Sequence, residues 1–194
     1  LSTLMDTSDD WIIERTGIRE RRWVDPTKDT VAGMAAKASR IALQRAGLSE
    51  KDVEFIVFAT ITPDYFFPGS GVLLQRELGL ESIGALDIRN ACSGFIYALA
   101  TGAQFIATGA HKKVLVIGAE KLSTIVNWTD RNTCVLFGDG AGAAVLQHRP
   151  GSGGILSSVN GSDGRFAEIL QIPGGGCKIP VTAENAAQRL NTIQ

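Results

Sequence analysis

Five stretches of the chain carry the pattern of β-strands. Residues 53–59 and 114–118 are nearly continuous apolar runs, which is typical of strands covered on both faces. The others are shorter runs bounded by turn residues, and the last two are joined by Gly138-Asp139-Gly140. The predicted strands are 53–59, 83–88, 114–118, 133–137 and 141–148.

Between these strands, apolar residues recur at the spacing of amphipathic helices. Ser8 precedes two acidic residues and predicts a helix start, and Gly17 predicts its end. Gly47 closes a longer apolar pattern, as a C′ glycine does. The predicted helices cover 9–15, 30–46, 70–78 and 93–107.

This alternation of strands and helices predicts a layered α/β domain with one mixed, mostly buried sheet and helices on its faces. We expect the domain to extend over 6–150. Beyond Gly151 the pattern loosens, so we expect 151–194 to begin a connection toward a C-terminal domain that lies outside these residues.

Composition excludes several functional classes. The chain has 194 residues, of which 44% are hydrophobic and 20% charged, with a formal net charge of −1. A near-neutral chain with scattered Lys and Arg does not favour nucleic-acid binding, and no apolar run is long enough for a membrane span. Three cysteines without metal-ligand spacing, and only two histidines, predict no metal site and a reducing, cytoplasmic location.

Cys92 is the strongest candidate for chemistry. It lies in Asn90-Ala91-Cys92-Ser93-Gly94-Phe95, where the 83–88 run gives way to the helix predicted over 93–107. Backbone N–H groups and the dipole at a helix start favour thiolate over thiol, and small neighbours admit a substrate carbonyl. A nucleophile for acyl transfer is therefore predicted. The alternative is a buried cysteine that acts as a small hydrophobic residue.

Gly138-Asp139-Gly140-Ala141-Gly142-Ala143 matches a dinucleotide-binding pattern by letter only. That pattern requires a helix directly after the glycines, to direct N–H groups at a pyrophosphate. An alternating strand pattern follows instead. We interpret this segment as a tight turn between strands.

Four segments together resemble the N-terminal half of the 3-oxoacyl-ACP synthase III family, condensing enzymes of the thiolase-like fold. The resemblance runs from about Asp6 to Pro173. Its motifs are Thr7-Ser8-Asp9-Asp10-Trp11-Ile12 with Arg15-Thr16-Gly17-Ile18-Arg19-Glu20-Arg21, Ala91-Cys92-Ser93-Gly94-Phe95, Thr129-Asp130-Arg131, and Phe137-Gly138-Asp139-Gly140-Ala141-Gly142-Ala143.

The resemblance implies a role for each matching residue. Cys92 would take an acyl group from acyl-CoA, Trp11 and Arg131 would flank the adenine of CoA, and Arg15 would lie near its phosphates. Flat indole and guanidinium groups are good stacking surfaces, and arginine matches phosphate geometry. Each residue also has an ordinary structural interpretation, namely a half-buried helix aromatic for Trp11 and solvated surface charges for the two arginines.

Phe67 lies in an aromatic loop, Pro63 to Pro68. The resemblance implies that it reaches into the acyl pocket of a partner subunit in a homodimer. A monomer has little reason to expose so much apolar area. Packing of the loop against its own chain is the structural alternative.

The implied reaction starts type II fatty acid synthesis. Cys92 would accept a short acyl group, and malonyl-ACP would lose CO₂ and condense to 3-oxoacyl-ACP. No cofactor is implied besides the CoA thioester substrate. The family's catalytic histidine and asparagine, and an oxyanion-hole glycine, belong to its second half, so the 194 residues alone are expected to be inactive in condensation. Alternatives are a polyketide- or quinolone-type condensing enzyme, or a non-catalytic domain that binds CoA or dimerises.

Overall fold

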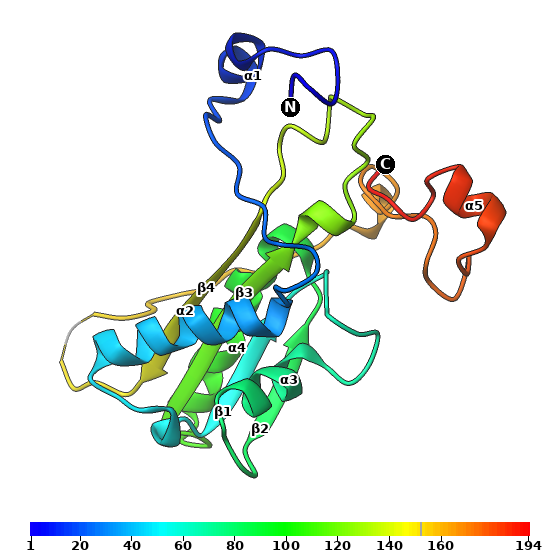
Figure 1. The fold of residues 1–194 in the computed structure, drawn as a ribbon. Helices are drawn as coiled ribbons and strands as arrows, with labels where there is room; N and C mark the ends of the chain where they lie inside the picture. Colours follow the sequence, from blue (N-terminus) through cyan, green and yellow to red (C-terminus); the bar gives the residue numbers. More distant parts are fainter. Residues whose placement is uncertain (152) are drawn as a thin grey trace. The chain divides into compact units, whose positions relative to one another are not determined.

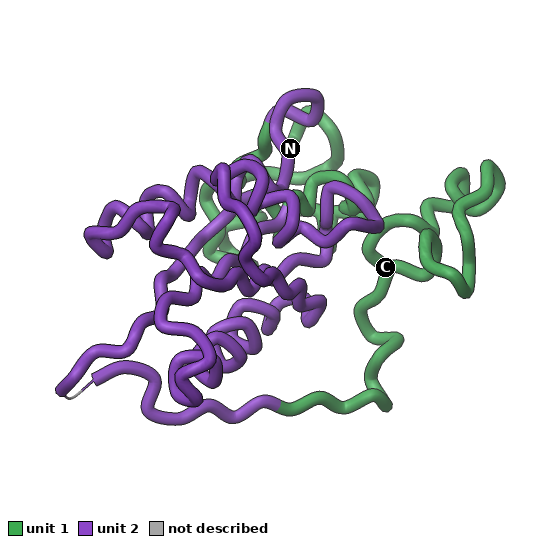
Figure 2. Tube along the Cα trace, turned by 90° about the horizontal axis from the view of Figure 1, so that it is seen from below, with its two compact units in different colours: residues 1–24, 121–139, 161–194 green, residues 25–120, 140–160 purple. Residues whose placement is uncertain are grey.

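The computed structural model describes residues 1–151 and 153–194. They form two compact units that interleave along the sequence (Figure 2). Unit 1 contains residues 1–24, 121–139 and 161–194, and unit 2 contains residues 25–120 and 140–160. The domain boundary expected near residue 150 stays a prediction.

A four-stranded sheet organises unit 2. The strands are β1 (Phe55–Ala59), β2 (Gly84–Ile88), β3 (Lys113–Lys121) and β4 (Asp139–Gln147), in the order β2-β1-β3-β4. β1 runs parallel to both β2 and β3. β4 runs in the opposite direction along β3 (Figure 1), so the sheet is mixed, as predicted.

Helices cover both faces of this sheet (Figure 1). α2 (Val31–Ala46) and α3 (Ser70–Glu77) lie together on one face, and α4 (Gly94–Ala107) lies on the other. Val57 of β1 and Val116 of β3 pack with Ala98 of α4 in one buried cluster. Because side chains alternate along a strand, Ile56 and Leu115 face the opposite side, and both are fully buried. The central strands are therefore covered on both faces, as their continuous apolar runs predicted.

The predicted ends of the first two helices are confirmed. Ser8 Oγ accepts from Trp11 N at the start of α1 (Asp9–Thr16), and Thr30 Oγ1 accepts from Gly33 N at the start of α2. Gly17 and Gly47 end these helices with left-handed backbone, a conformation that glycine adopts without the Cβ penalty.

The strand predicted over 133–137 is wrong. This segment forms consecutive turns in unit 1, in which the N–H of Cys134 donates to the carbonyl of Asp130. Its apolar residues are buried all the same, in a cluster that includes Cys134, Val135 and Ile12. A short apolar run reports burial, and burial inside a turn gives the same sequence signal as burial inside a strand.

The remaining elements of unit 1 are short. They are the single turns η3 (Leu122–Thr124) and η4 (Gly164–Phe166) and the helix α5 (Ala183–Ala187), while η1 (Glu50–Asp52) and η2 (Ala91–Ser93) belong to unit 2. Among the described residues, no helix is both long enough and apolar enough to cross a bilayer.

Candidate active site

Cys92 lies in a sharp turn between β2 and α4. The chain leaves β2 at Ile88, and Ala91 then adopts a φ of +46°, in the left-handed region that non-glycine residues rarely occupy. Cys92 follows in the 3₁₀ turn η2, one turn before α4 begins at Gly94, and it is exposed. Residues held in such sparse backbone regions cluster at active sites, so the conformation of Ala91 supports a functional turn.

The end of β1 contacts both sides of this turn. The N–H of Thr60, just after β1, donates to the carbonyl of Ile88 at 3.1 Å. A Cβ added to Gly94 would lie 3.3 Å from the Cβ of Ala59, so the start of α4 rests closely on the end of β1. Cys92 is thus presented at the carboxyl ends of parallel strands, the edge at which open α/β sheets commonly bind ligands.

The three cysteines differ in environment. Cys134 is buried, its Sγ lies 3.1 Å from Met5 Sδ, and desolvation, with a smaller contribution from Asp130, raises the pKa of its thiol. Cys92 and Cys177 are exposed, but only Cys92 lies in a strand-to-helix turn. Cys134 therefore fits the structural role that a buried thiol usually has.

His111 does not serve Cys92. It lies just beyond the C-terminus of α4, whereas Cys92 precedes the N-terminus, and a helix of 14 residues is about 20 Å long. The imidazole packs against the rings of Phe55, at 4.7 Å, and Phe105, at 5.5 Å. The side chain of His111 is therefore half-buried in an aromatic contact.

The three residues expected to bind CoA come together in unit 1. The guanidinium carbons of Arg15 and Arg131 each lie 4.6 Å from the centre of the Trp11 ring. Nη1 of Arg131 also donates to the carbonyl of Asp6 at 2.8 Å. Residues 15 and 131 are far apart in sequence, so only the fold brings them to one indole. The result is a flat, cationic aromatic cluster.

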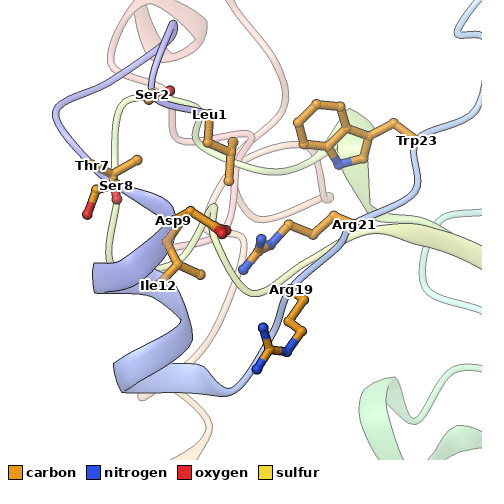
Figure 3. A pocket seen from close by; sticks show the side chains of 9 residues that line it. All are labelled: Leu1, Ser2, Thr7, Ser8, Asp9, Ile12, Arg19, Arg21 and Trp23. Carbon is orange, nitrogen blue, oxygen red and sulfur yellow. The ribbon is translucent and has the colours of Figure 1, made fainter.

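A pocket of about 240 Å³ lies beside α1 in the same unit (Figure 3). Its wall carries hydroxyl groups and the two guanidinium groups of Arg19 and Arg21. The guanidinium of Arg21 already has partners within the protein. Its Nε donates to the carbonyl of Val135, and one Nη donates to the carbonyl of Ile18. Arg21 therefore ties the segment after α1 to the buried turn at 133–137. The lining is Leu1, Ser2, Thr7, Ser8, Asp9, Ile12, Arg19, Arg21 and Trp23.

The aromatic loop of unit 2 projects its side chains outward. Tyr65, Phe66 and Phe67 are 60%, 78% and 81% exposed. These rings therefore do not pack within unit 2, whereas the choice between a partner subunit and another part of the same chain stays a prediction.

Sequence reasoning missed the role of Asp139. Its carboxylate accepts hydrogen bonds from the N–H of Val24 and from both the N–H and the hydroxyl of Ser123, at 2.7 to 3.1 Å. Its own N–H donates to the carbonyl of Arg22. Asp139 thus joins two segments of unit 1, 1–24 and 121–139, and β4 begins at Asp139 itself. A strand rather than a helix follows Gly138, which agrees with rejecting a nucleotide-binding role. The predicted tight turn between two strands is wrong, because residues 131–136 before it form turns and not a strand. The isolated acid between two glycines was the available signal.

Fold and site together define a thiolase-like α/β protein with a cysteine at the start of its α4 helix. A family model for 3-oxoacyl-[acyl-carrier-protein (ACP)] synthase III matches residues 86–164, which include the Cys92 turn and β4. The chain is similar to this family over these residues.

Individual relatives agree. The chain is 49% identical over 193 residues to the beta-ketoacyl-[acyl-carrier-protein] synthase III of Caldanaerobacter subterraneus subsp. tengcongensis, covering 100% of this chain and 58% of the relative. The crystal structure of 3-oxoacyl-[acyl-carrier-protein] synthase III from Aquifex aeolicus is similar with a TM-score of 0.85 and 43% identity, over 95% of this chain and 59% of that one. The priming β-ketosynthase from the R1128 polyketide biosynthetic pathway is similar with a TM-score of 0.71 and 38% identity, over 75% and 43%. The chain therefore spans a little under three fifths of the length of these synthase III relatives.

Proposed function

We propose that this chain provides the acyl-accepting part of a 3-oxoacyl-ACP synthase III, with Cys92 as the nucleophile. The observation that carries the proposal is the exposed thiol beside the strained Ala91, held on the carboxyl ends of β1 and β2. The names of the relatives support the same chemistry.

In the first half-reaction, the Cys92 thiolate attacks the carbonyl carbon of a short acyl-CoA. The C–S bond to CoA breaks, CoA leaves as a thiolate that takes up a proton, and the acyl group stays on Cys92. In the second half-reaction, malonyl-ACP loses CO₂, and the resulting carbanion attacks the acyl-enzyme and releases the Cys92 thiolate. The second step develops charge on an enolate oxygen, which requires hydrogen-bond donors beyond those assigned here. We therefore expect the 194 residues alone to acylate slowly and not to complete condensation.

For the acyl donor, we propose that the Trp11 cluster receives CoA. A stacked adenine would replace the direct contact between the indole and Arg131, so that the base lies between two flat surfaces. Arg15 would pair with the CoA phosphates, because a guanidinium fork matches phosphate oxygens. CoA enters as a substrate thioester, and we assign no further cofactor or metal.

We further propose a homodimer in which Phe67 enters the acyl pocket of the second copy. The exposed aromatic rings support this, as does the half-exposed Leu86 on β2. Within the described residues, no strand pairs with the outer edge of β2. A strand edge of this kind, next to apolar side chains, favours association with another chain. We place the protein in the cytoplasm.

The deciding experiment uses the complete polypeptide of the source reading frame. Incubation with a radiolabelled short acyl-CoA, followed by peptide mapping, should place the label on Cys92 and release one CoA per acyl group. Cys177→Ser is the matched control, because it removes the other exposed thiol and should leave labelling unchanged. Binding of CoA with no covalent label at Cys92 would favour the non-catalytic CoA-binding alternative.

One second candidate has a specific observation behind it. The likeness to the priming β-ketosynthase favours a specialised condensing enzyme that uses the same nucleophile. A panel of acyl-CoA donors, tested against ACP-bound and CoA-bound malonyl acceptors, separates the two. Preference for the shortest donors with malonyl-ACP supports the fatty acid role.

A further inference from the structure

Three carboxylates surround the exposed aromatic segment Tyr65–Phe67. Asp64 lies directly before it, Asp87 lies on the neighbouring strand β2, and Glu120 lies at the end of β3. Glu120 and Asp87 accept backbone N–H groups of residues just before and just after the segment, whereas Asp64 accepts those of Val31 and Ala32 in α2. The backbone is therefore held in place by hydrogen bonds just before and just after the exposed rings.

Asp64 makes the closest of these attachments. One of its oxygens accepts from Val31 N at 2.7 Å and the other from Ala32 N at 2.9 Å, so that both are used at the first turn of α2. N–H groups in the first turn of a helix have no partner within the helix, and a carboxylate satisfies them while matching the helix dipole. Asp64 is half-buried, which limits screening by water.

Asp87 repeats the arrangement at α3, just after the segment. Its carboxylate accepts from Ser70 N and, at 2.8 Å, from Gly71 N. A Cβ on Gly69 or Gly71 would come within 2.9 Å of this carboxylate, so two glycines leave the space that the acid occupies. Before the segment, Glu120 accepts from Ile61 N at 2.9 Å and from the hydroxyls of Thr60 and Thr62.

We propose that Asp64, assisted by Asp87, is a positioning residue that holds Tyr65–Phe67 ready for insertion into a second copy of this chain. The proposal rests on the dimer proposed above. Ordering a loop during association costs binding free energy, and a loop that is already ordered avoids most of that cost. The carboxylates therefore strengthen the dimer without touching the partner themselves.

The test compares Asp64→Asn with Asp52→Asn in the complete polypeptide. Asp52 is a matched control because it also accepts a backbone N–H at a helix start, that of Ser49, but it does not contact the aromatic segment. Hydrogen–deuterium exchange of residues 63–69 should rise at least about tenfold in Asp64→Asn, because an amide offers only one acceptor to the two N–H groups. The dimer dissociation constant, from sedimentation over a dilution series, should rise by about tenfold. Asp52→Asn should change neither quantity.

Unchanged exchange at 63–69 in Asp64→Asn would overturn the proposal, whatever the dimer does. Faster exchange with an unchanged dissociation constant would overturn the link between loop order and association. If Asp64→Asn does not fold, Asp87→Asn replaces it, with a smaller expected increase in both quantities because Asp87 is more exposed. The proposed dimer contact has its own test. If Phe67→Ala, made in the otherwise unchanged protein, leaves the dimer dissociation constant unchanged, then Phe67 does not contribute to the dimer.

Discussion

The Cys92 turn and the Trp11 cluster are fixed in different ways. Cys92 is held by the backbone: β2 ends beneath it, the N–H of Thr60 bonds to Ile88, and Gly94 rests on Ala59. The Trp11 cluster is held by long side chains, Arg15 and Arg131, which reach one indole from two distant segments. A position set by hydrogen-bonded parallel strands is stiff, whereas a position set by guanidinium stems adapts to a ligand. The proposed nucleophile is thus held in a fixed geometry, whereas the proposed CoA cluster can adjust.

The largest expected effect comes from Cys92, the proposed nucleophile. Cys92→Ser in the complete polypeptide should lower acyl transfer from acyl-CoA by at least about a thousandfold, because the hydroxyl is a far weaker nucleophile without a dedicated base. The midpoint of thermal unfolding should stay within a few degrees, since the exposed thiol adds little packing. The measurement is single-turnover release of CoA. Retention of more than a tenth of the rate would disprove the assignment of Cys92.

The next effect tests how unit 1 holds its segments together. Asp139→Ala removes the acceptor for three hydrogen bonds, from Val24 and Ser123, and we expect a loss of about 3 kcal/mol in the free energy of unfolding. Urea denaturation monitored by tryptophan fluorescence measures it, because Trp23 and Trp128 lie in contact in this unit. Asp163→Ala is the control, since its hydrogen bonds are local and exposed. Equal losses in the two variants would contradict a joining role for Asp139.

A change in the Trp11 cluster should alter KM for acyl-CoA. Arg131→Ala should raise KM for acyl-CoA by about tenfold while leaving kcat within about twofold, because stacking on adenine acts on binding and lies far from the bond that breaks. Arg131→Lys should recover only part of the affinity, since an ammonium group lacks the flat guanidinium face. A fall in kcat with KM unchanged would place Arg131 in the chemical step instead.

The stiffness of the packing between α4 and the sheet, which supports the Cys92 turn, can be tested at Gly102 of α4. A Cβ there would lie 3.0 Å from both Leu146 Cδ1 and Val116 Cγ2. Alanine gains about 1 kcal/mol of helix propensity over glycine, but overpacking against the sheet costs about 1–3 kcal/mol. We expect Gly102→Ala to be destabilising by about 1 kcal/mol in urea denaturation. Gly109→Ala does not serve as a control, because Gly109 has a φ of +74°. A stabilised Gly102→Ala would show that α4 can move away from the sheet.

The smallest effect is electrostatic and lies at the far end of the sheet. The hydrogen bond from Lys113 at 2.9 Å, followed by those from Ser49, lowers the pKa of Asp52 well below its usual value of 3.8. Because the folded-state pKa is depressed, this contribution is present above about pH 4 and is lost as the pH falls further. Asp52→Asn should therefore reduce the difference in urea midpoint between pH 6 and pH 3, by a small amount since the ion pair is partly open to water. An unchanged difference would contradict a role for this ion pair.

Much of the fold was predictable because its signals are local. The apolar runs of β1 and β3 indicate strands covered on both faces, and Ser8, Thr30, Gly17 and Gly47 mark helix ends through contacts within a few residues. The segment 133–137 shows the limit. Its apolar residues are buried as expected, but the tertiary structure buries them in turns, and no local rule distinguishes the two cases.

The candidate site also has features that were predictable from the sequence and features that were not. Cys92, the aromatic residues and the arginines were recognisable by type and motif. The meeting of Arg15 and Arg131 on Trp11, the strained φ of Ala91, the packing of His111 on Phe55 and the carboxylate attachments of Asp64 and Asp87 were not. Each of these joins residues that are distant in sequence or depends on a backbone angle that the neighbours impose.

The sequence by itself determined the class of fold, most of its strands and helices and the candidate nucleophile Cys92, because hydrophobic period, capping chemistry and the small residues around Cys92 act within one or two turns of chain. Only the tertiary structure decided which cysteines are exposed and which is buried, which carboxylates receive helix N–H groups and which cations reach the indole. These outcomes depend on burial and distance, and both arise only when separate segments pack against one another.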